Sequence, residues 1–171
     1  TDAALPLWMA DRLVLSPQEQ ERWRIQQGTP AAPGEINEDT NPFEVGLANR
    51  VSLSKGCYVG QETLPKLATY DGVKRQLRRW HWQSPSGNSS LSAPPSALFS
   101  AGDGGDSSSR AGQITSALHL GDGLWIGLAL VRRQALERTE LGAGEGPQAP
   151  NLQLSRPPTF LDPPVGAGRQ P

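Results

Sequence analysis

The sequence predicts an α+β protein with a modest hydrophobic core and long irregular inserts. One observation is a helix with start and stop signals in the first third of the chain, and a second is a pair of apolar strands joined by a tight turn further on. The third is composition: 36% of the 171 residues are hydrophobic, and there are 19 glycines and 16 prolines. The chain is therefore too apolar to be fully disordered and too rich in Gly and Pro to be packed throughout.

Charge and cysteine content exclude several classes of protein. The formal net charge of −1 lacks the electrostatic footprint of a dedicated nucleic-acid binder. A single cysteine excludes an intramolecular disulfide framework and any CxxC zinc site. No apolar run approaches the length of about 18 residues that a membrane helix needs, and a basic stretch followed by an apolar core is missing at the N-terminus. We therefore expect a cytoplasmic protein or one of an organelle interior, with no membrane partner.

The first predicted helix follows Ser16 and ends at Gly28. Ser16 is suited to cap it, Pro17 to its first turn, and Glu19 completes a capping box. Gly28 supplies the C-terminal stop. Residues 29–34 contain two prolines and a glycine, which predicts a loop.

Short elements are predicted between this loop and residue 83. We expect a turn of helix after Asn41-Pro42, a brief strand over 51–54, and a helix over 60–67 that Pro65 limits or kinks. Residues 74–83 look extended. Because Leu77 and Trp80 are out of phase for a flat strand, we expect a bulge or a twisted barrel strand there.

The second half alternates low-complexity and apolar segments. Residues 84–112 hold 18 Ser, Gly or Pro among 29 residues, which predicts a loose loop. Strands over 113–118 and 124–131 flank a turn at 121–123. Residues 141–171 hold 7 prolines and 5 glycines, so a mostly unstructured tail is expected, with one extended patch at 152–154.

The densest chemical signal is an octapeptide around the single thiol. It consists of Lys55, Gly56, Cys57, Tyr58, Val59, Gly60, Gln61 and Glu62. The glycines permit positive φ, while the nearby lysine and the start of the following helix would favour a thiolate. The competing interpretation is that Cys57 is a small buried hydrophobe, as most free cysteines are.

This octapeptide and four further blocks resemble the YgfZ-type folate-binding proteins, relatives of the aminomethyltransferase (T-protein) of the glycine cleavage system. The motif K-G-C-Y-x-G-Q-E carries most of the resemblance, and its thiol favours the YgfZ branch over the T-protein branch. The supporting blocks are R-I-x-x-G-x-P at 24–30, N-P-x-E-x-G-L at 41–47, and the barrel strands at 112–117 and 126–133.

The resemblance implies a domain arrangement. Residues 1–70 would be the C-terminal part of a ferredoxin-like folate-binding domain, and 71–140 a small antiparallel β-barrel interrupted by the loop 84–112. Residues 141–171 would be a disordered tail. The chain would thus match the C-terminal half of the family, and the catalytic aspartate of true aminomethyltransferases would lie in sequence that precedes it.

The resemblance also implies a ligand and residues that hold it. Tetrahydrofolate or a derivative would be the cofactor, and Glu44 would bind its pterin ring, because a carboxylate accepts the hydrogen bonds of such an edge. The alternative for Glu44 is a charge at a helix N-terminus. Arg24 would neutralise the glutamate tail or pair with Glu44, unless it is a surface arginine. Glu38 and Asp39 are expected at the loop surface.

The remaining candidates favour structural roles. Trp80, His81 and Trp82 lie among arginines, an arrangement suited to stacking on single-stranded nucleic acid, but one face of a barrel strand would look the same. Nucleic-acid binding is therefore not expected. His81 and His119 are the only histidines, and no metal site is expected.

Three functions remain open. The first is a folate-binding accessory protein that supports iron–sulfur cluster assembly or repair, with Cys57 as the working thiol and cluster-assembly proteins or client enzymes as partners. The second is a tetrahydrofolate-dependent aminomethyl or other one-carbon transferase. The third is a truncated, non-catalytic scaffold. One cysteine cannot hold a cluster alone, since clusters usually take four ligands.

Overall fold

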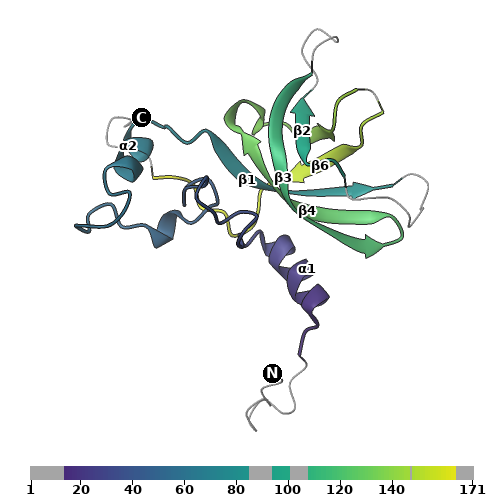
Figure 1. The fold of residues 1–171 in the computed structure, drawn as a ribbon, viewed down its shortest axis with the longest axis horizontal. Helices are drawn as coiled ribbons and strands as arrows, with labels where there is room; N and C mark the ends of the chain where they lie inside the picture. The colour runs from purple at the N-terminus through teal and green to yellow at the C-terminus, as the bar shows by residue number, and fades with distance from the viewer. Residues whose placement is uncertain (1–13, 85–93, 101–107, 147, 165–171) are drawn as a thin grey trace.

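A computed structural model describes residues 14–84, 94–100, 108–146 and 148–164 of the chain. Six strands form a closed antiparallel barrel, and two helices with their connecting loops lie outside it (Figure 1). Within the described residues no helix has the length and apolar character needed to span a membrane.

Helix α1 (Pro17–Gln27) is the element that local sequence signals predict best. The Ser16 hydroxyl accepts a hydrogen bond from the Glu19 amide, and the Glu19 carboxylate accepts one from the Ser16 amide, so the predicted capping box is confirmed. Gly28 ends the helix in the left-handed region, with φ of 74°. Ile25 is the one residue of α1 that is buried.

Helix α2 (Thr63–Thr69) begins later than the sequence predicts. The segment before it, residues 60–62, forms turns, and Pro65 lies in the first turn of the helix, where its missing N–H has no intrahelical acceptor to lose. Leu64 and Ala68 are buried against Phe43 and Val73. The chain from Asn41 to α2 is therefore held by a small core of its own.

The barrel runs in the order β1-β4-β3-β2-β5-β6 and closes by pairing β6 with β1. Its strands are β1 (Arg75–Gln83), β2 (Ala97–Ser100), β3 (Ser109–Gly121), β4 (Leu124–Arg132), β5 (Glu140–Ala143) and β6 (Asn151–Ser155). The predicted hairpin is confirmed as β3–β4. Its two central residues, Asp122 and Gly123, both have positive φ, as the tightest hairpin turns require.

Leu77 and Trp80 point to opposite faces of β1, and both faces are covered. Trp80 lies in the barrel interior with residues of the other strands, whereas Leu77 packs outside the barrel with Ile25 and Phe160. The register of β1 with β4 is continuous. The odd spacing of Leu77 and Trp80 therefore does not come from a bulge in this pairing. Burial on both faces also explains the nearly unbroken apolar run of β4.

Two predictions of disorder are wrong for part of their range. Strand β2 lies inside the segment 84–112 that we expected to be a loose loop, and β5 and β6 lie inside the expected tail 141–171. Each strand has four or five residues among prolines and glycines, and long-range pairing with the barrel stabilises it. Of these two segments, residues 85–93, 101–107, 147 and 165–171 fall outside the described residues, as does the start of the expected first domain at 1–13.

The predicted strand over 51–54 is also wrong. Residues 53 and 54 form a bend, residues 51 and 52 have no regular structure, and none of the four pairs with a described strand. The turn predicted after Asn41-Pro42 is present at 42–46 and is followed by a short 3₁₀ helix at Ala48–Arg50. A ferredoxin-like arrangement is not visible in the described residues.

Candidate functional site

Glu44 is fixed by the asparagine that opens its turn. The Asn41 side-chain oxygen accepts hydrogen bonds from the amides of Phe43 (3.1 Å) and Glu44 (3.2 Å), and Glu44 Oε2 accepts one in return from the Asn41 amide at 3.3 Å. The backbone carbonyl of Glu44 accepts a bond from the Leu77 amide at 2.8 Å. This last bond ties the turn to β1 and sets the carboxylate beside the end of the barrel.

The Glu44 carboxylate lines a pocket of about 780 Å³ and pairs there with Arg75. Its Oε1 lies 3.0 Å from Arg75 Nε, and its side chain is 7% exposed. A carboxylate has about four acceptor positions, so the bonds from Arg75 and Asn41 leave it able to accept more. We call this cavity the Glu44 pocket. It is lined by Asp39, Glu44, Asp71, Gly72, Val73, Lys74, Arg75, Arg132, Arg133 and Gln134.

The Glu44 pocket is rich in cations because the ends of two paired strands meet there. Arg75 opens β1, Arg132 closes β4, and the two are register partners. The sequence predicts both strands but not this pairing, so it misses the cationic character of the site. Arg75 also donates a hydrogen bond to the backbone carbonyl of Asp39, which is exposed as expected and lines the same pocket.

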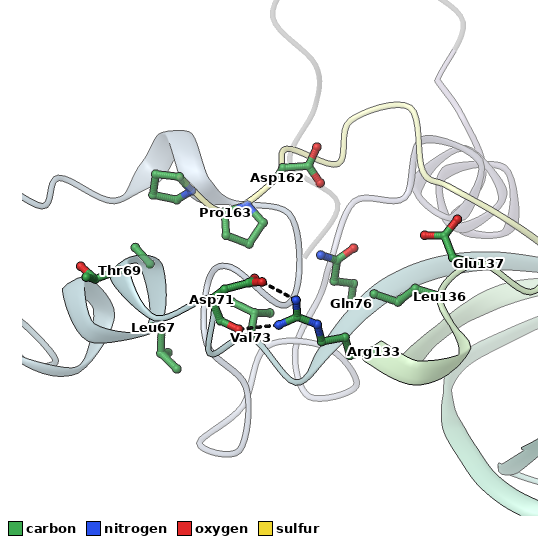
Figure 2. A pocket seen from close by; sticks show the side chains of 12 residues that line it. Leu67, Thr69, Asp71, Val73, Gln76, Arg133, Leu136, Glu137, Asp162 and Pro163 are labelled. Atoms are coloured by element: carbon green, nitrogen blue, oxygen red, sulfur yellow. Dashed lines mark hydrogen bonds and ion pairs between the residues drawn. The ribbon is translucent and has the colours of Figure 1, made fainter. Parts of the chain in front are cut away.

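A second pocket of about 360 Å³ shares the ion-paired side chains of Arg133 and Asp71 with the Glu44 pocket (Figure 2). The second pocket is bounded by Leu67 and Ala68 of α2 on one side and by Leu136, Asp162 and Pro163 on the other. Figure 2 shows the Arg133 guanidinium meeting both the carboxylate and the backbone carbonyl of Asp71.

Arg24 is committed to a network away from Glu44. It pairs with Glu21 at 2.7 Å and Glu35 at 3.1 Å, and its Nη2 donates to the Ser116 hydroxyl at 2.7 Å. These partners, above all the Glu21 hydrogen bond, raise the pKa of Arg24. The expected pairing with Glu44 is therefore not found, and a surface position is excluded too. Arg24 instead joins α1 to β3.

Glu35 is a buried carboxylate that the sequence does not single out. It is fully buried, and it accepts hydrogen bonds from the Ser116 hydroxyl at 2.7 Å and the Ala31 amide at 3.0 Å. No local pattern marks it, because its partners come from α1 and from β3, 81 residues away. Its contacts indicate a structural role, holding the 29–36 loop between helix and barrel.

Cys57 is exposed, so its interpretation as a small buried hydrophobe is wrong. The thiol residue itself has positive φ, 49°, and its amide donates to the Gln61 side-chain oxygen at 2.8 Å. Of the two motif glycines, Gly60 has positive φ, 91°, whereas Gly56 is not in that region. Helix α2 starts six residues after Cys57, so its N-terminus is not adjacent to the thiol.

The other motif residues surround the thiol loop. Tyr58 is half-buried against the small core of α2, and Lys55, Gln61 and Glu62 are exposed. Cys57 does not line the Glu44 pocket or its neighbour. The structure thus presents the thiol to solvent but does not bring it together with Glu44.

In the aromatic cluster of β1, Trp80 is buried, Trp82 is half-buried and His81 is exposed. Trp80 lies in the barrel core, where its indole N–H donates to the Leu128 carbonyl at 3.1 Å, so it offers no stacking face. His119 stacks on Trp125 with ring centroids 4.8 Å apart. The described residues hold no cluster of three potential metal-ligating His, Cys, Asp or Glu side chains.

Comparison with known proteins shows which proteins the chain is related to. It is 32% identical over 128 residues to a tRNA-modifying protein YgfZ of Vibrio vulnificus, an alignment that covers 72% of this chain and 38% of the relative. The chain is homologous to the YgfZ proteins. The predicted resemblance of the chain to that family is thereby confirmed.

The alignment with a second relative is shorter, but the sequence identity is higher. A chloroplastic protein of Arabidopsis thaliana, whose name describes it as a transferase, is 48% identical over 66 residues, 39% of this chain and 15% of that protein. No family model matches the chain. The chain spans less than half the length of these two relatives.

Proposed function

We propose that this chain forms part of a folate-binding accessory protein that supports iron–sulfur cluster assembly or repair. The observation that carries the proposal is the Glu44 carboxylate in the wall of a cation-rich pocket. A pterin presents a ring N–H beside an amino group, which a carboxylate accepts as a pair of hydrogen bonds. The carboxylates of the folate tail suit the surrounding cations.

The Arg75 ion pair supports the same role. It holds the mostly buried Glu44 side chain in one orientation, at a cost in desolvation that ligand hydrogen bonds would help to offset. Folate-binding is implied by homology with YgfZ proteins. Tetrahydrofolate or a derivative would supply or accept a one-carbon unit when bound, and Glu44 with its neighbours would orient the pterin.

Cys57 is the proposed working thiol. Its exposure leaves the sulfur able to meet a partner protein, and positive φ on a non-glycine residue is a conformation that functional sites often hold at some cost. A soft thiolate ligates iron transiently, and it takes over the outer sulfur of a partner protein's persulfide as the partner's thiolate leaves. Because the thiol lies outside the Glu44 pocket, we propose that it acts at the protein surface. Its partners there would be cluster-assembly proteins or client enzymes.

The accessory role is tested by the activity of iron–sulfur enzymes in cells that rely on this protein. Cys57→Ala should abolish the support while leaving the melting temperature unchanged, because the side chain is exposed and makes no hydrogen bond. Ser54→Ala, another exposed position in the same loop, is the control and should retain full support. Normal cluster-enzyme activity in the Cys57→Ala cells would refute the thiol role.

A one-carbon transferase is the second candidate, favoured by the transferase name of the Arabidopsis relative. It predicts turnover of a tetrahydrofolate adduct with the other glycine-cleavage components. The accessory role predicts none. Such turnover, undiminished by Cys57→Ala, would replace the first candidate with the second.

A further inference from the structure

Strands β1 and β6 part from each other beside Trp82, at the end of β1 that lies away from the Glu44 pocket. Strand β1 pairs with β4 as far as Gln83, whereas its register with β6 covers only Arg79–His81. A pocket of about 700 Å³ lies where the two strands part, and we call it the Trp82 pocket. It is lined by His81, Trp82, Gln83, Gln148, Ala149, Pro150, Asn151 and Gln153.

The lining of the Trp82 pocket is neutral apart from one histidine. His81 is its only ionisable side chain, and Ala149 and Pro150 add apolar surface to that of the Trp82 ring. A phosphate, carboxylate or ammonium group would lose water there without gaining a carboxylate, lysine or arginine partner. The pocket therefore suits an uncharged ligand.

Three side chains of the Trp82 pocket carry donors that no described group uses. The ring of Trp82 packs on the barrel core, but its indole N–H makes no hydrogen bond with any described residue and is not enclosed by protein. The side-chain amides of Gln148 and Asn151 are exposed and likewise bond to no described group. The other two amide side chains of the lining donate to distant parts of the chain. The pocket thus presents an aromatic face surrounded by donors, which calls for a ligand that supplies acceptors.

We propose that the Trp82 pocket binds a proline-rich, extended segment of a partner protein. In the polyproline II conformation such a segment has no internal hydrogen bonds, so its backbone carbonyls are free acceptors. Proline has no backbone N–H that would need an acceptor in return, and its ring packs on aromatic side chains. The pocket has the volume usual for ligand sites, about 300–1,000 Å³, which is room for a few residues. The inference is independent of the folate and thiol roles.

Two other occupants fit the Trp82 pocket less well. A strand added to the edge of β1 would find only Trp82 and Gln83 beyond the pairing with β6, and two residues are too short an edge for backbone pairing to hold a strand. RNA would bring its phosphates to a lining without lysine or arginine. The observations therefore favour a neutral segment that is recognised by its carbonyls and its apolar rings.

Fluorescence anisotropy of a labelled decaproline peptide, titrated with the full-length protein, tests the inference. The wild type should bind it saturably, and a Gly-Ser peptide of equal length should not bind. Trp82→Phe keeps an aromatic ring but removes the indole N–H, so it should weaken binding about two- to tenfold. Gln148→Ala/Asn151→Ala removes the other two donors at exposed positions and should weaken binding by at least a similar factor. Trp23→Phe, at an exposed tryptophan of α1 outside the pocket, is the matched control and should bind as the wild type does.

The NMR signals of the indole N–H groups give a second readout. The Trp82 signal, assigned by its loss in Trp82→Phe, should shift as decaproline is added, whereas that of Trp80, which donates to the Leu128 carbonyl, should not. No saturable binding of decaproline, or equal affinity of the wild type and either folded pocket variant, overturns the inference. A Trp82 shift produced by maltohexaose or by oligouridylate, and not by decaproline, assigns the pocket to a sugar or to RNA and overturns it as well.

Discussion

Gly127 faces Trp80 across the β1–β4 pair, and the space that it leaves is filled by the indole. A Cβ at this position would lie 2.4 Å from the indole ring and 2.0 Å from the Ser116 carbonyl oxygen of β3. The glycine is thus required by close approach rather than by a turn. Gly56, in the thiol motif, contrasts with it, because a Cβ there would meet nothing within 4 Å.

Gly127→Ala should destabilise the protein by about 2 kcal/mol or more, since the obstacle is backbone on one side and a fully buried ring on the other. Gly56→Ala should change the free energy of unfolding by less than about 0.5 kcal/mol. Denaturant unfolding measures both values. Equal stability of the two variants would contradict the packing described for β1, β3 and β4.

At the scale of elements, the sequence predicts those helices and turns that local signals encode. It does not predict the strands that depend on long-range pairing. The capping box of α1 and the β3–β4 turn are encoded within a few residues, and both are confirmed. Strands β2, β5 and β6 are short and lie among prolines and glycines, so they are strands only because the barrel pairs with them. Composition cannot report such pairing.

The cap of α1 gives a prediction at this scale. Ser16→Ala removes the acceptor for the Glu19 amide, so we expect a loss of about 1 kcal/mol in unfolding free energy. Ser54→Ala, at an exposed loop position outside any helix, is the control, and its loss should stay below about 0.5 kcal/mol. Equal losses in a denaturant titration would mean that the cap does not stabilise the fold.

The ion pair between Glu21 and Arg24, both in α1, predicts that stability depends on pH. The hydrogen bond with Arg24 lowers the pKa of Glu21. A lowered folded-state pKa gives stability that is complete above the unfolded value, about 4.3, and is lost as the pH falls through the folded one. Melting temperature should therefore fall between about pH 5 and pH 3 more steeply for the wild type than for Glu21→Gln.

Glu38→Gln is the control for this titration, because Glu38 is exposed and removing its charge should leave the slope as in the wild type. Parallel pH profiles for the wild type and Glu21→Gln would show that the Arg24 pair does not contribute to stability.

At the scale of the whole molecule, closure of the barrel depends on the segment that composition marks as a tail. Leu141, Ala143 and Leu152 are all buried in the barrel core, and β6 bonds back to β1. Beyond β6, the chain returns to the helical side, where Leu161 bridges to Leu47 and Phe160 covers the outer face of β1 and β4 (Figure 1). This segment is therefore part of both cores.

Leu152→Ala should cost about 2–5 kcal/mol, as truncation of a fully buried leucine does. Leu161→Ala, at a leucine that is 43% exposed, should cost clearly less. Thermal or denaturant unfolding gives both values. A Leu152→Ala variant as stable as the wild type would mean that β6 does not close the barrel.

The candidate site shows the same division between local and long-range information. Glu44 and Cys57 are marked by short motifs, and the exposure of the thiol agrees with a working role. The pairing of Glu44 with Arg75, the cations at the joined ends of β1 and β4, and the burial of Glu35 depend on contacts between distant segments. Sequence patterns mark the residues but not which of them meet.

Calorimetric titration of the full-length protein with 5-formyltetrahydrofolate tests most directly whether Glu44 binds the pterin ring. Glu44→Gln replaces one acceptor oxygen with an amide donor and should weaken binding about tenfold or more. Glu38→Gln, the same change at an exposed position of the preceding loop, should bind as the wild type does. Equal affinity of Glu44→Gln and wild type, with both proteins folded, would contradict the account.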